Sequence, residues 1–407
     1  MISFLLGSGF SFEEGIPGVK EINDRLVNLQ AKHIRISSDL SASFLEKDQE
    51  DPNGRFSLKD RMFVEEFIQF YIHEVIKDKS KFNYEDFFDY YFFPYRDNNF
   101  PKELKNFLDN YRNKIQATHR HIDDNINLIG RFHNTFSQLI ASLLNQSKYY
   151  QDVSLLNYPK YDPFIRFLKY CISDHDIKVH SLNHDMFFEF LGSHHEEIAG
   201  YYCDGFTDLG SPYYGDVSFT DQGIIKTHKV RIKFFNGKYN NKLCFSKLHG
   251  SVDTYIFNLA SPTPDLTRVK RNWRVGDLYK EETNKETGEL QYVSGYQYNY
   301  PDFLSGTTAK ILYYDNEFYK PLFDHFCHNL QSSDYLFVIG YGFKDEKINE
   351  MIEKNYLSKG KRMIVVDPYP KEDAFQKEYD ITYIRKRITE LTYKEWTSLC
   401  ELKATVS

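Results

Sequence analysis

The N-terminal residues constrain the fold more than any other part of the chain. An apolar run, Ile2 to Leu6, stops at the glycine-rich residues 7–11, and a Gly-Ile-Pro triplet follows at residues 15–17. A buried strand that ends in a glycine turn and leads into a helix is typical of sites that bind phosphate groups. Gly7 permits the tight turn, and Gly9 lets backbone N–H groups approach a pyrophosphate. The pattern therefore predicts a phosphate-binding turn at the end of a buried strand.

Short apolar runs elsewhere in the chain predict further buried parallel strands. Helical patterns lie between several of these runs, at residues 18–29, 317–330, 345–357 and 389–402. Strands that alternate with helices indicate an α/β fold with a doubly wound, Rossmann-like parallel sheet. The predicted strands are Ile2–Leu6, 177–182, 243–248, Tyr335–Ile339, Met363–Val366 and Ile381–Ile384.

A large insertion follows the first predicted strand. It contains two apolar stripes at helical spacing, within residues 63–76 and 126–143, which we interpret as core between helices. We therefore predict a discontinuous nucleotide-binding domain, residues 1–30 and 174–407, interrupted by a helical insertion domain, residues 31–173. The insertion argues against a dehydrogenase, whose acidic ribose anchor stands about 20 residues after its glycines.

Two polar stretches of the predicted nucleotide-binding domain have no clear pattern. Residues 201–241 are rich in Gly, Tyr and Asp and have the composition of a hairpin, and residues 258–301 form a second long polar stretch. We leave both without an assigned architecture.

Composition excludes several classes of protein. The apolar fraction of 41% and the charged fraction of 27% are typical of a soluble globular protein. With a net charge of -7, we expect no direct binding of nucleic acid by this chain alone. No apolar run reaches the ~18 residues that span a bilayer, and a basic leader is absent, so we expect a cytoplasmic protein without membrane contact. The five cysteines, none at C-x-x-C spacing, predict neither a disulfide framework nor a cysteine-ligated metal site.

Chemically useful residues follow the predicted strands at their carboxyl ends. In an open parallel sheet these ends line one crevice, where ligands bind. Each signal alone is weak, because Asn183 and Asp185 can cap a helix and a histidine before a glycine is usually a loop residue. The conjunction is specific. The strand ends carry Gly7 and Gly9, residues 181–185 (Ser-Leu-Asn-His-Asp), residues 247–251 (Lys-Leu-His-Gly-Ser), residues 340–343 (Gly-Tyr-Gly-Phe), and Asp367-Pro368.

In this order, these motifs resemble those of the sirtuin family. Residues 7–17 are similar to the sirtuin motif G-A-G-[IF]-S-x-x-x-G-I-P, and residues 181–185 are similar to T-Q-N-x-D. His249-Gly250 stands where the family has its catalytic H-G pair, and residues 340–342 resemble the G-[TY]-S turn that contacts the cofactor. Asp367 falls where the family places a residue on the adenosine ribose. The resemblance covers most of the chain outside the insertion and the two polar stretches.

Two departures narrow the resemblance. Deacylase sirtuins carry a four-cysteine zinc module between the H-G and G-T-S motifs, whereas this chain has one cysteine, Cys327, between His249 and Gly340. The family's Asp-Phe-Arg after G-I-P is Gly-Val-Lys here, at residues 18–20. Both departures argue against protein deacylation. They match the sirtuin-like NADases of bacterial anti-phage defence, and most of all the sirtuin-like subunit of sirtuin–HerA systems.

The resemblance implies that NAD is the substrate and that no metal is required. Cleavage of the nicotinamide–ribose bond releases a neutral leaving group, so the site needs positioning and charge placement more than a strong nucleophile. Asn183 can bond the nicotinamide ribose or order a water, Asp185 can hold the carboxamide, and His249 can accept a proton. These three are the predicted catalytic residues. The predicted NAD-binding residues are Gly7, Ser8, Gly9, Phe10, Ser11, Ile16, Pro17, Gly340, Tyr341, Gly342 and Asp367.

We therefore expect an NAD⁺ glycohydrolase that releases nicotinamide and ADP-ribose, acting as the effector of an abortive-infection, anti-phage system. Two alternatives remain. One is an ADP-ribosyltransferase that passes ADP-ribose to a protein acceptor, and the other is a non-catalytic module that senses NAD or ADP-ribose. Because unregulated NAD hydrolysis is toxic, the resemblance implies control by assembly. We expect a homo-oligomer with a HerA-type ATPase or helicase as its partner.

Overall fold

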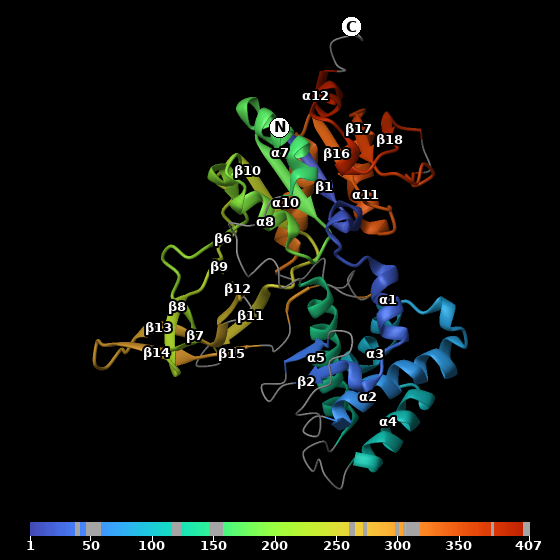
Figure 1. The fold of residues 1–407 in the computed structure, drawn as a ribbon, viewed down its shortest axis with the longest axis vertical. Coiled ribbons are helices and arrows are strands. Elements are labelled where there is room, and N and C mark those ends of the chain that lie inside the picture. Colours follow the sequence, from blue (N-terminus) through green and yellow to red (C-terminus); the bar gives the residue numbers. More distant parts are fainter. Residues whose placement is uncertain are drawn as a thin grey trace. The chain divides into compact units, whose positions relative to one another are not determined.

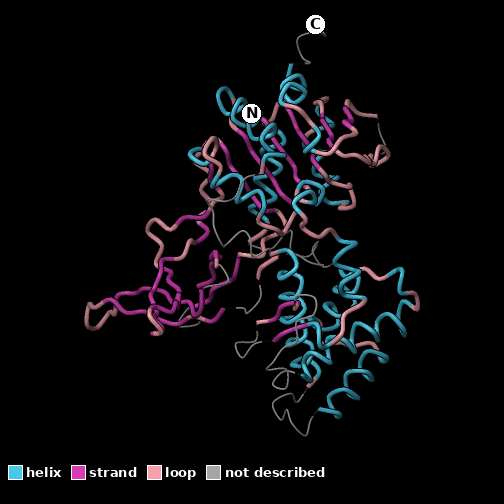
Figure 2. Tube along the Cα trace, viewed as in Figure 1, coloured by secondary structure: helices cyan, strands magenta, loops and turns pink. Residues whose placement is uncertain are grey.

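The computed structural model describes residues 1–36, 41–45, 58–115, 124–145, 158–259, 265–271, 275–297, 301–303, 306, 318–375 and 378–401. The chain forms two compact units (Figures 1 and 2). We call them the sheet unit, which holds Met1–Glu14, Ser147–Phe303 and Glu317–Ser407, and the helical unit, which holds Gly15–Gln146 and Leu304–Asn316. Compared with the predicted boundaries, residues 15–30 join the helical unit and residues 147–173 join the sheet unit.

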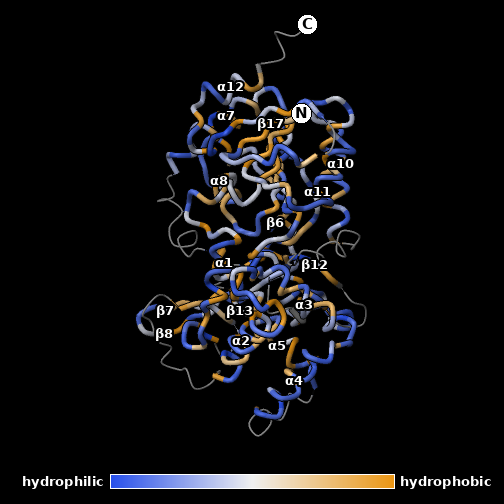
Figure 3. Tube along the Cα trace, turned by 90° about the vertical axis from the view of Figure 1, so that its right-hand side faces the viewer, coloured by the Kyte–Doolittle hydropathy of each residue, from blue (hydrophilic) through white to orange (hydrophobic). Residues whose placement is uncertain are grey.

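Seven parallel strands form the centre of the sheet unit, in the order β18-β17-β16-β1-β4-β10-β5. β1 is buried along its whole length, as its largely apolar sequence predicts for a strand covered on both faces. In Figure 3, the tube around β17 is coloured as hydrophobic, which agrees with a buried sheet. The predicted doubly wound α/β sheet is confirmed, and β5 adds one strand to the six that were predicted. The strands are β1 Ile2–Leu6, β4 Ile177–Ser181, β5 Tyr202–Cys203, β10 Leu243–Lys247, β16 Tyr335–Ile339, β17 Met363–Val366 and β18 Ile381–Ile384.

Helices pack on both faces of this sheet. The ring of Phe4 in β1 lies 5.8 Å from the ring of Phe164 in α7. The preceding residue, Ser3, points the other way and bonds Ser333 at the end of α10 at 2.6 Å. Among the described residues, no helix is both long enough and apolar enough to cross a bilayer. The helices of this unit are α7 Asp162–Asp174, α8 Phe187–His194, α10 Lys320–Ser332, α11 Glu346–Asn355 and α12 Tyr393–Glu401.

The two polar stretches of the sheet unit fold mainly into antiparallel strands (Figure 2). The first contains the hairpin that its composition suggested, β7 Tyr213–Asp221 with β8 Ile224–Arg231. The second was left unassigned and forms β12 to β15. Tyr213, Phe257 and Val269 belong to the small core that these strands share. The remaining strands are β6 Phe206–Thr207, β9 Phe234–Phe235, β11 Thr254–Leu259, β12 Asp265–Lys270, β13 Val275–Thr283, β14 Leu290–Ser294 and β15 Tyr296–Gln297.

The helical unit has an aromatic core. The two apolar stripes of the sequence lie on α2 and α5, and their rings pack together: Phe67 lies 4.8 Å from Phe132 and 5.2 Å from Phe87 of α3. The interpretation of the stripes as core between helices is therefore confirmed. The elements are α1 Val19–Val27, β2 Ile34–Ile36, β3 Ala42–Phe44, α2 Leu58–Phe70, the π-helical turn η4 Tyr71–Ile76, α3 Tyr84–Arg96, α4 Lys102–Ile115 and α5 Asn125–Leu144.

One buried histidine makes the stability of the helical unit depend on pH. Burial lowers the pKa of His133 in α5 to about 4. The unfolded chain, with a histidine pKa of about 6.5, binds more protons below that pH. His133 therefore contributes stability that is present above pH ~6.5 and is lost as the pH falls toward ~4. We expect a loss of about 3 kcal/mol over this range and a flatter profile for His133→Gln, measured by urea titration at each pH. An identical profile in the variant would contradict this assignment.

Candidate functional site

The predicted residues collect at the carboxyl ends of the strands around β1. The chain runs from β1 to β4 and β10 on one side, then to β16, β17 and β18 on the other, so the strand order reverses between β1 and β16. Ligands of open α/β sheets bind at such a reversal. Gly7 follows β1, Asn183 follows β4, His249 follows β10 and Gly340 follows β16. The topology thus brings four distant motifs to one edge of the sheet.

The glycine turns after β1 and β16 interlock. The Gly9 N–H donates to the Gly340 carbonyl at 3.0 Å, and Gly340 has a φ of 61°. A Cβ on Gly7 would lie 2.5 Å from the Gly340 oxygen, and a Cβ on Gly9 would lie 2.8 Å from the Gly340 Cα. From the sequence pattern, a glycine is expected at position 9 because it lets the backbone approach a pyrophosphate. The structure supplies a second reason, because the backbone of the neighbouring turn fills the space of a side chain.

Gly340→Ala is expected to destabilise the sheet unit by about 2–4 kcal/mol, from left-handed backbone strain together with overpacking. Its Cβ would lie 2.5 Å from the backbone of Gly9. Gly342→Ala is the matched control, because a Cβ there meets nothing within 4 Å. Chemical denaturation should leave the Gly342 variant within about 0.5 kcal/mol of the wild type. Equal stability of the two variants would refute the interlock.

Asn183 and Asp185 connect the turn after β4 to the turn after β1. Asn183 Nδ2 donates to the Gly7 carbonyl at 2.8 Å and to Ser11 Oγ at 3.3 Å. Ser11 in turn donates to Asp185 Oδ2 at 2.8 Å, while Asp185 Oδ1 accepts from the Phe187 N–H at 2.9 Å where α8 begins. Asp185 therefore bonds the first N–H group of α8 and anchors the glycine turn. Because Nδ2 of Asn183 is engaged, its side-chain oxygen is the group that can accept from a water or a ribose hydroxyl.

His249 faces a carboxylate that the sequence analysis did not single out. His249 Nε2 lies 3.5 Å from Asp345 Oδ2, and both side chains are at least nine-tenths buried. The other oxygen of Asp345 accepts from the N–H groups of Lys347 and Ile348 at 3.1 and 3.3 Å. These bonds cap α11 and fix the carboxylate. A carboxylate on one ring nitrogen orients the imidazole and favours a proton there.

Two neighbouring residues hold this pair in place. The Tyr341 hydroxyl accepts from the Asp345 N–H at 3.2 Å, and it lies 3.1 Å from the Asp345 carbonyl. Burial raises the pKa of Tyr341, so this hydroxyl keeps its proton. Gly250 has a φ of 80°, and a Cβ there would lie 2.3 Å from the Asp302 carbonyl. The glycine after His249 is thus required by the backbone alone.

Two predicted residues of the β1 turn point in different directions. Ser8 is exposed, whereas the Phe10 ring is 1% exposed and packs 5.6 Å from both Tyr161 and Phe187. Tyr161 also donates to the Phe10 carbonyl at 2.5 Å. Phe10 therefore anchors the turn in the core, which leaves the backbone and Ser8 as its ligand-facing parts.

Asp367 follows β17, the neighbour of β16, and so lies at the same edge of the sheet as Gly340. Asp367, at the end of β17, is partly buried, and its Oδ1 accepts from the Tyr369 N–H at 2.7 Å. Burial raises the pKa of Asp367. Ile16 and Pro17 belong to the helical unit, where Ile16 is buried.

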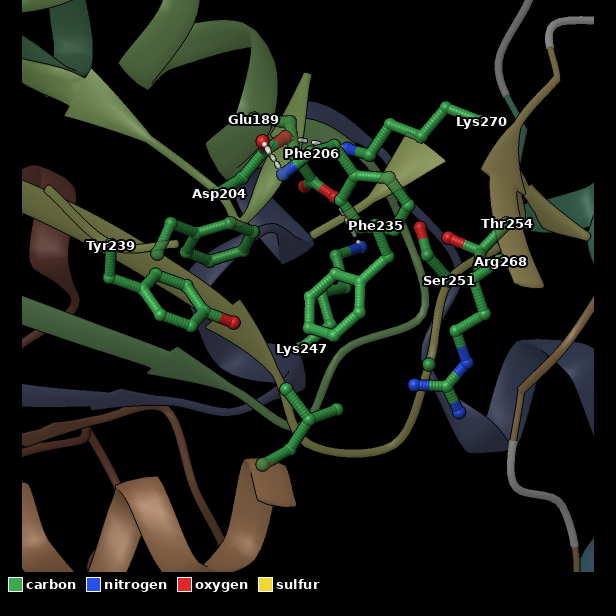
Figure 4. A pocket seen from close by; sticks show the side chains of 13 residues that line it. Glu189, Asp204, Phe206, Phe235, Tyr239, Lys247, Ser251, Thr254, Arg268 and Lys270 are labelled. Atoms are coloured by element: carbon green, nitrogen blue, oxygen red, sulfur yellow. Dashed lines mark hydrogen bonds and ion pairs between the residues drawn. The ribbon is translucent and has the colours of Figure 1, made fainter. Parts of the chain in front are cut away.

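A small pocket of about 30 Å³ lies beside Gly250 (Figure 4). Charged side chains line it in pairs: Lys247 with Glu189 at 3.1 Å, and Lys270 with Asp204 at 2.9 Å. Burial raises the pKa of Glu189 to about 7. The volume suits one or two water molecules and not a nicotinamide ring. We interpret the cluster as the support that ties β10, and hence His249, to α8 and β12.

Sequence spacing could not reveal Asp345 or the Lys247–Glu189 pair. Asp345 stands three residues after Gly342 and looks like an ordinary helix cap. Its partner His249 is almost a hundred residues away, on a strand that is not adjacent to β16. Lys247 directly precedes the Leu-His-Gly motif, and that position was the one available signal.

Comparisons with known proteins add little to this geometry. No protein-family model matches the chain, and no curated protein matches its sequence. Among solved structures, a Sir2 homolog in complex with NAD is similar at 10% identity, over 98% of this chain and 90% of that chain, with a TM-score of 0.35. A similarity of this size supports no conclusion by itself, so the proposals below depend on the residues and their contacts.

Proposed function

We propose that this chain is an NAD⁺ glycohydrolase, which cleaves the nicotinamide–ribose bond with water to give nicotinamide, ADP-ribose and a proton. One observation carries the proposal. The Gly7–Ser11 turn, Asn183, His249 and the Gly340 turn follow four strands around the reversal point of one parallel sheet. The motifs that resemble a sirtuin thus meet at the edge where such sheets bind nucleotides.

The residues suit a dissociative cleavage. Nicotinamide leaves as a neutral molecule, and positive charge develops on the ribose. The Asp185 carboxylate, fixed by Ser11 at 2.8 Å, supplies negative charge near the turn. The Nδ2 group of Asn183 is held by the Gly7 carbonyl, so the side-chain oxygen of Asn183 can accept from a water and orient it. His249, oriented by Asp345, can take the proton from that water or from a ribose hydroxyl.

Incubation of the purified chain with NAD tests the proposal directly. We expect equimolar release of nicotinamide and ADP-ribose, followed by chromatography. Nicotinamide release without free ADP-ribose, with mass added to a protein, would support the transferase instead. Saturable NAD binding without any nicotinamide release would support the sensing module. Absence of binding would refute a nucleotide site at this edge.

We further propose that the activity serves anti-phage defence, in a homo-oligomer controlled by a HerA-type ATPase. The support is the motif resemblance and the need to restrain a toxic activity. Most residues of the two apolar stripes are buried within the helical unit, where Phe67 packs against Phe132, and Val75 is 39% exposed. Light scattering and NAD turnover, measured with and without a purified HerA-type ATPase, test the assembly. A monomer whose turnover ignores the ATPase would refute this extension and leave the hydrolase proposal intact.

A further inference from the structure

Three side chains form a row across neighbouring strands of the main sheet, away from the site described above. Cys203 of β5 is the register partner of Cys244 in β10, and Cys244 is the partner of Lys178 in β4. Register partners of a parallel sheet point to the same face. Cys203 Sγ lies 3.4 Å from Cys244 Sγ, and Lys178 Nζ lies 3.2 Å from Cys244 Sγ. Two thiols and a cation are therefore in mutual contact.

The surroundings make Cys244 the more acidic thiol of the pair. The Cys203 thiol donates to Cys244 Sγ, and this bond, with the nearby Lys178 ammonium, lowers the pKa of Cys244. The Asn241 carbonyl, 2.9 Å from Cys244 Sγ, accepts its proton in the thiol form. Cys203 keeps its proton, because its bond to Cys244 and burial raise its pKa. The pair thus combines a sulfur whose contacts favour the nucleophilic thiolate with a neighbouring thiol.

We propose that Cys203 and Cys244 are an oxidation site, at which a peroxide converts the two thiols to a disulfide that links β5 to β10. The Cys244 sulfur attacks one peroxide oxygen, the O–O bond breaks, and the hydroxide that leaves takes up a proton to become water. Cys203 sulfur then attacks the resulting sulfenic sulfur, the S–O bond breaks, and the second hydroxide leaves as water with the Cys203 proton. In total, two thiols lose two electrons and two protons, and one hydrogen peroxide becomes two waters.

The backbone permits this bond. Neighbouring strands lie about 4.8 Å apart, which is within the range of Cα separations that a disulfide spans. β5 has two residues and lies at the edge of the sheet, so it can follow the small movement that the bond needs. Cys244 is 2% exposed and Cys203 is partly exposed. A small peroxide can reach the pair from the side of Cys203, whereas the buried Cys244 sulfur has no room to attack the disulfide bond of glutathione disulfide.

The chain contains its own comparison pair. The free thiols of Cys171 and Cys400 are hydrogen-bonded to each other. This hydrogen bond, burial and the nearby Asp174 all raise the pKa of Cys171. The groups that raise the pKa of Cys171 are a thiol and a carboxylate, whereas Cys244 has the Lys178 ammonium at 3.2 Å from its sulfur. The comparison of the two pairs tests the effect of this cation. Cys327 serves as a single-thiol reference.

The experiment treats the full chain with equimolar hydrogen peroxide, alkylates the remaining thiols at timed intervals and maps the peptides by mass spectrometry. We expect the Cys203–Cys244 disulfide to form at least about tenfold faster than the Cys171–Cys400 disulfide. Lys178→Met should slow it by about tenfold with an unchanged circular dichroism spectrum. In Cys203→Ser, dimedone should trap a sulfenic acid on Cys244.

Three results would overturn the proposal. The first is that, after peroxide treatment, Cys203 and Cys244 are still alkylated as completely as Cys327, so that neither thiol of the pair has been oxidised. The second is an equal oxidation rate of the two cysteine pairs, and the third is an unchanged rate in a folded Lys178→Met. Glutathione disulfide at the same concentration should leave both thiols of the Cys203–Cys244 pair free, and oxidation by it at the peroxide rate would contradict the access argument.

Discussion

His249→Ala should lower the rate of NAD cleavage by about 10³-fold, the usual contribution of a positioned general base. The physical reason is the position of His249 at the end of β10, where its ring is buried and paired with Asp345 at 3.5 Å. Asn183→Ala should cause a loss of about 10²-fold, because it removes the amide that bonds Gly7 and can orient the water. Nicotinamide release at saturating NAD, followed by chromatography, measures both.

These losses must arise without unfolding. Circular dichroism and the thermal midpoint of each variant should stay close to those of the wild type. Ser332→Ala, at an exposed position at the end of α10 and before β16, lies at the opposite edge of the sheet and serves as a control that should keep the activity. Near wild-type turnover in a folded His249→Ala would remove the histidine from the mechanism, and loss of folding in Asn183→Ala would mark a structural role for that amide.

Asp345→Asn should lower turnover by about tenfold to a hundredfold and should move the acidic limb of the pH–rate profile to lower pH. A carboxylate beside an imidazole favours its protonated form, so loss of the charge lets the ring act as a base at lower pH. Asparagine remains a good helix cap, which preserves the bonds that Asp345 Oδ1 accepts from Lys347 and Ile348. The affinity for NAD should change much less than turnover.

The control for this variant is Glu346→Gln, which removes one negative charge from the next residue at an exposed position. It should leave both turnover and the pH profile unchanged. A purely structural role of Asp345 predicts lower stability with an unmoved pH limb. An unmoved limb in the folded Asp345→Asn variant would therefore reject the pairing with His249 as a functional contact.

The sequence alone determined the main sheet and the approximate location of the site. β1, β16 and β17 are short and almost wholly apolar, as expected for strands that helices cover on both faces. The stripes on α2 and α5 were equally clear, because a helix that buries one face repeats its apolar residues every three or four positions. Glycine and polar residues at strand ends completed the prediction.

The strands β12 to β15 escaped the sequence analysis for a related reason. In β14, Leu290, Gln291 and Tyr292 are exposed, so neither a continuous nor an alternating apolar pattern marks the strand. These sheets bury one small core, and much of their surface faces solvent. Their pairing is set by backbone bonds, which every residue type can make.

Only the tertiary structure decided which distant residues contact one another. The contacts between Gly9 and Gly340, His249 and Asp345, and Cys203 and Cys244 each join residues from different strand ends or strands. Sequence spacing records distance along the chain, whereas these contacts depend on strand order and register across the sheet. Strand order and register follow from the packing of all the elements together, so no single motif contains them.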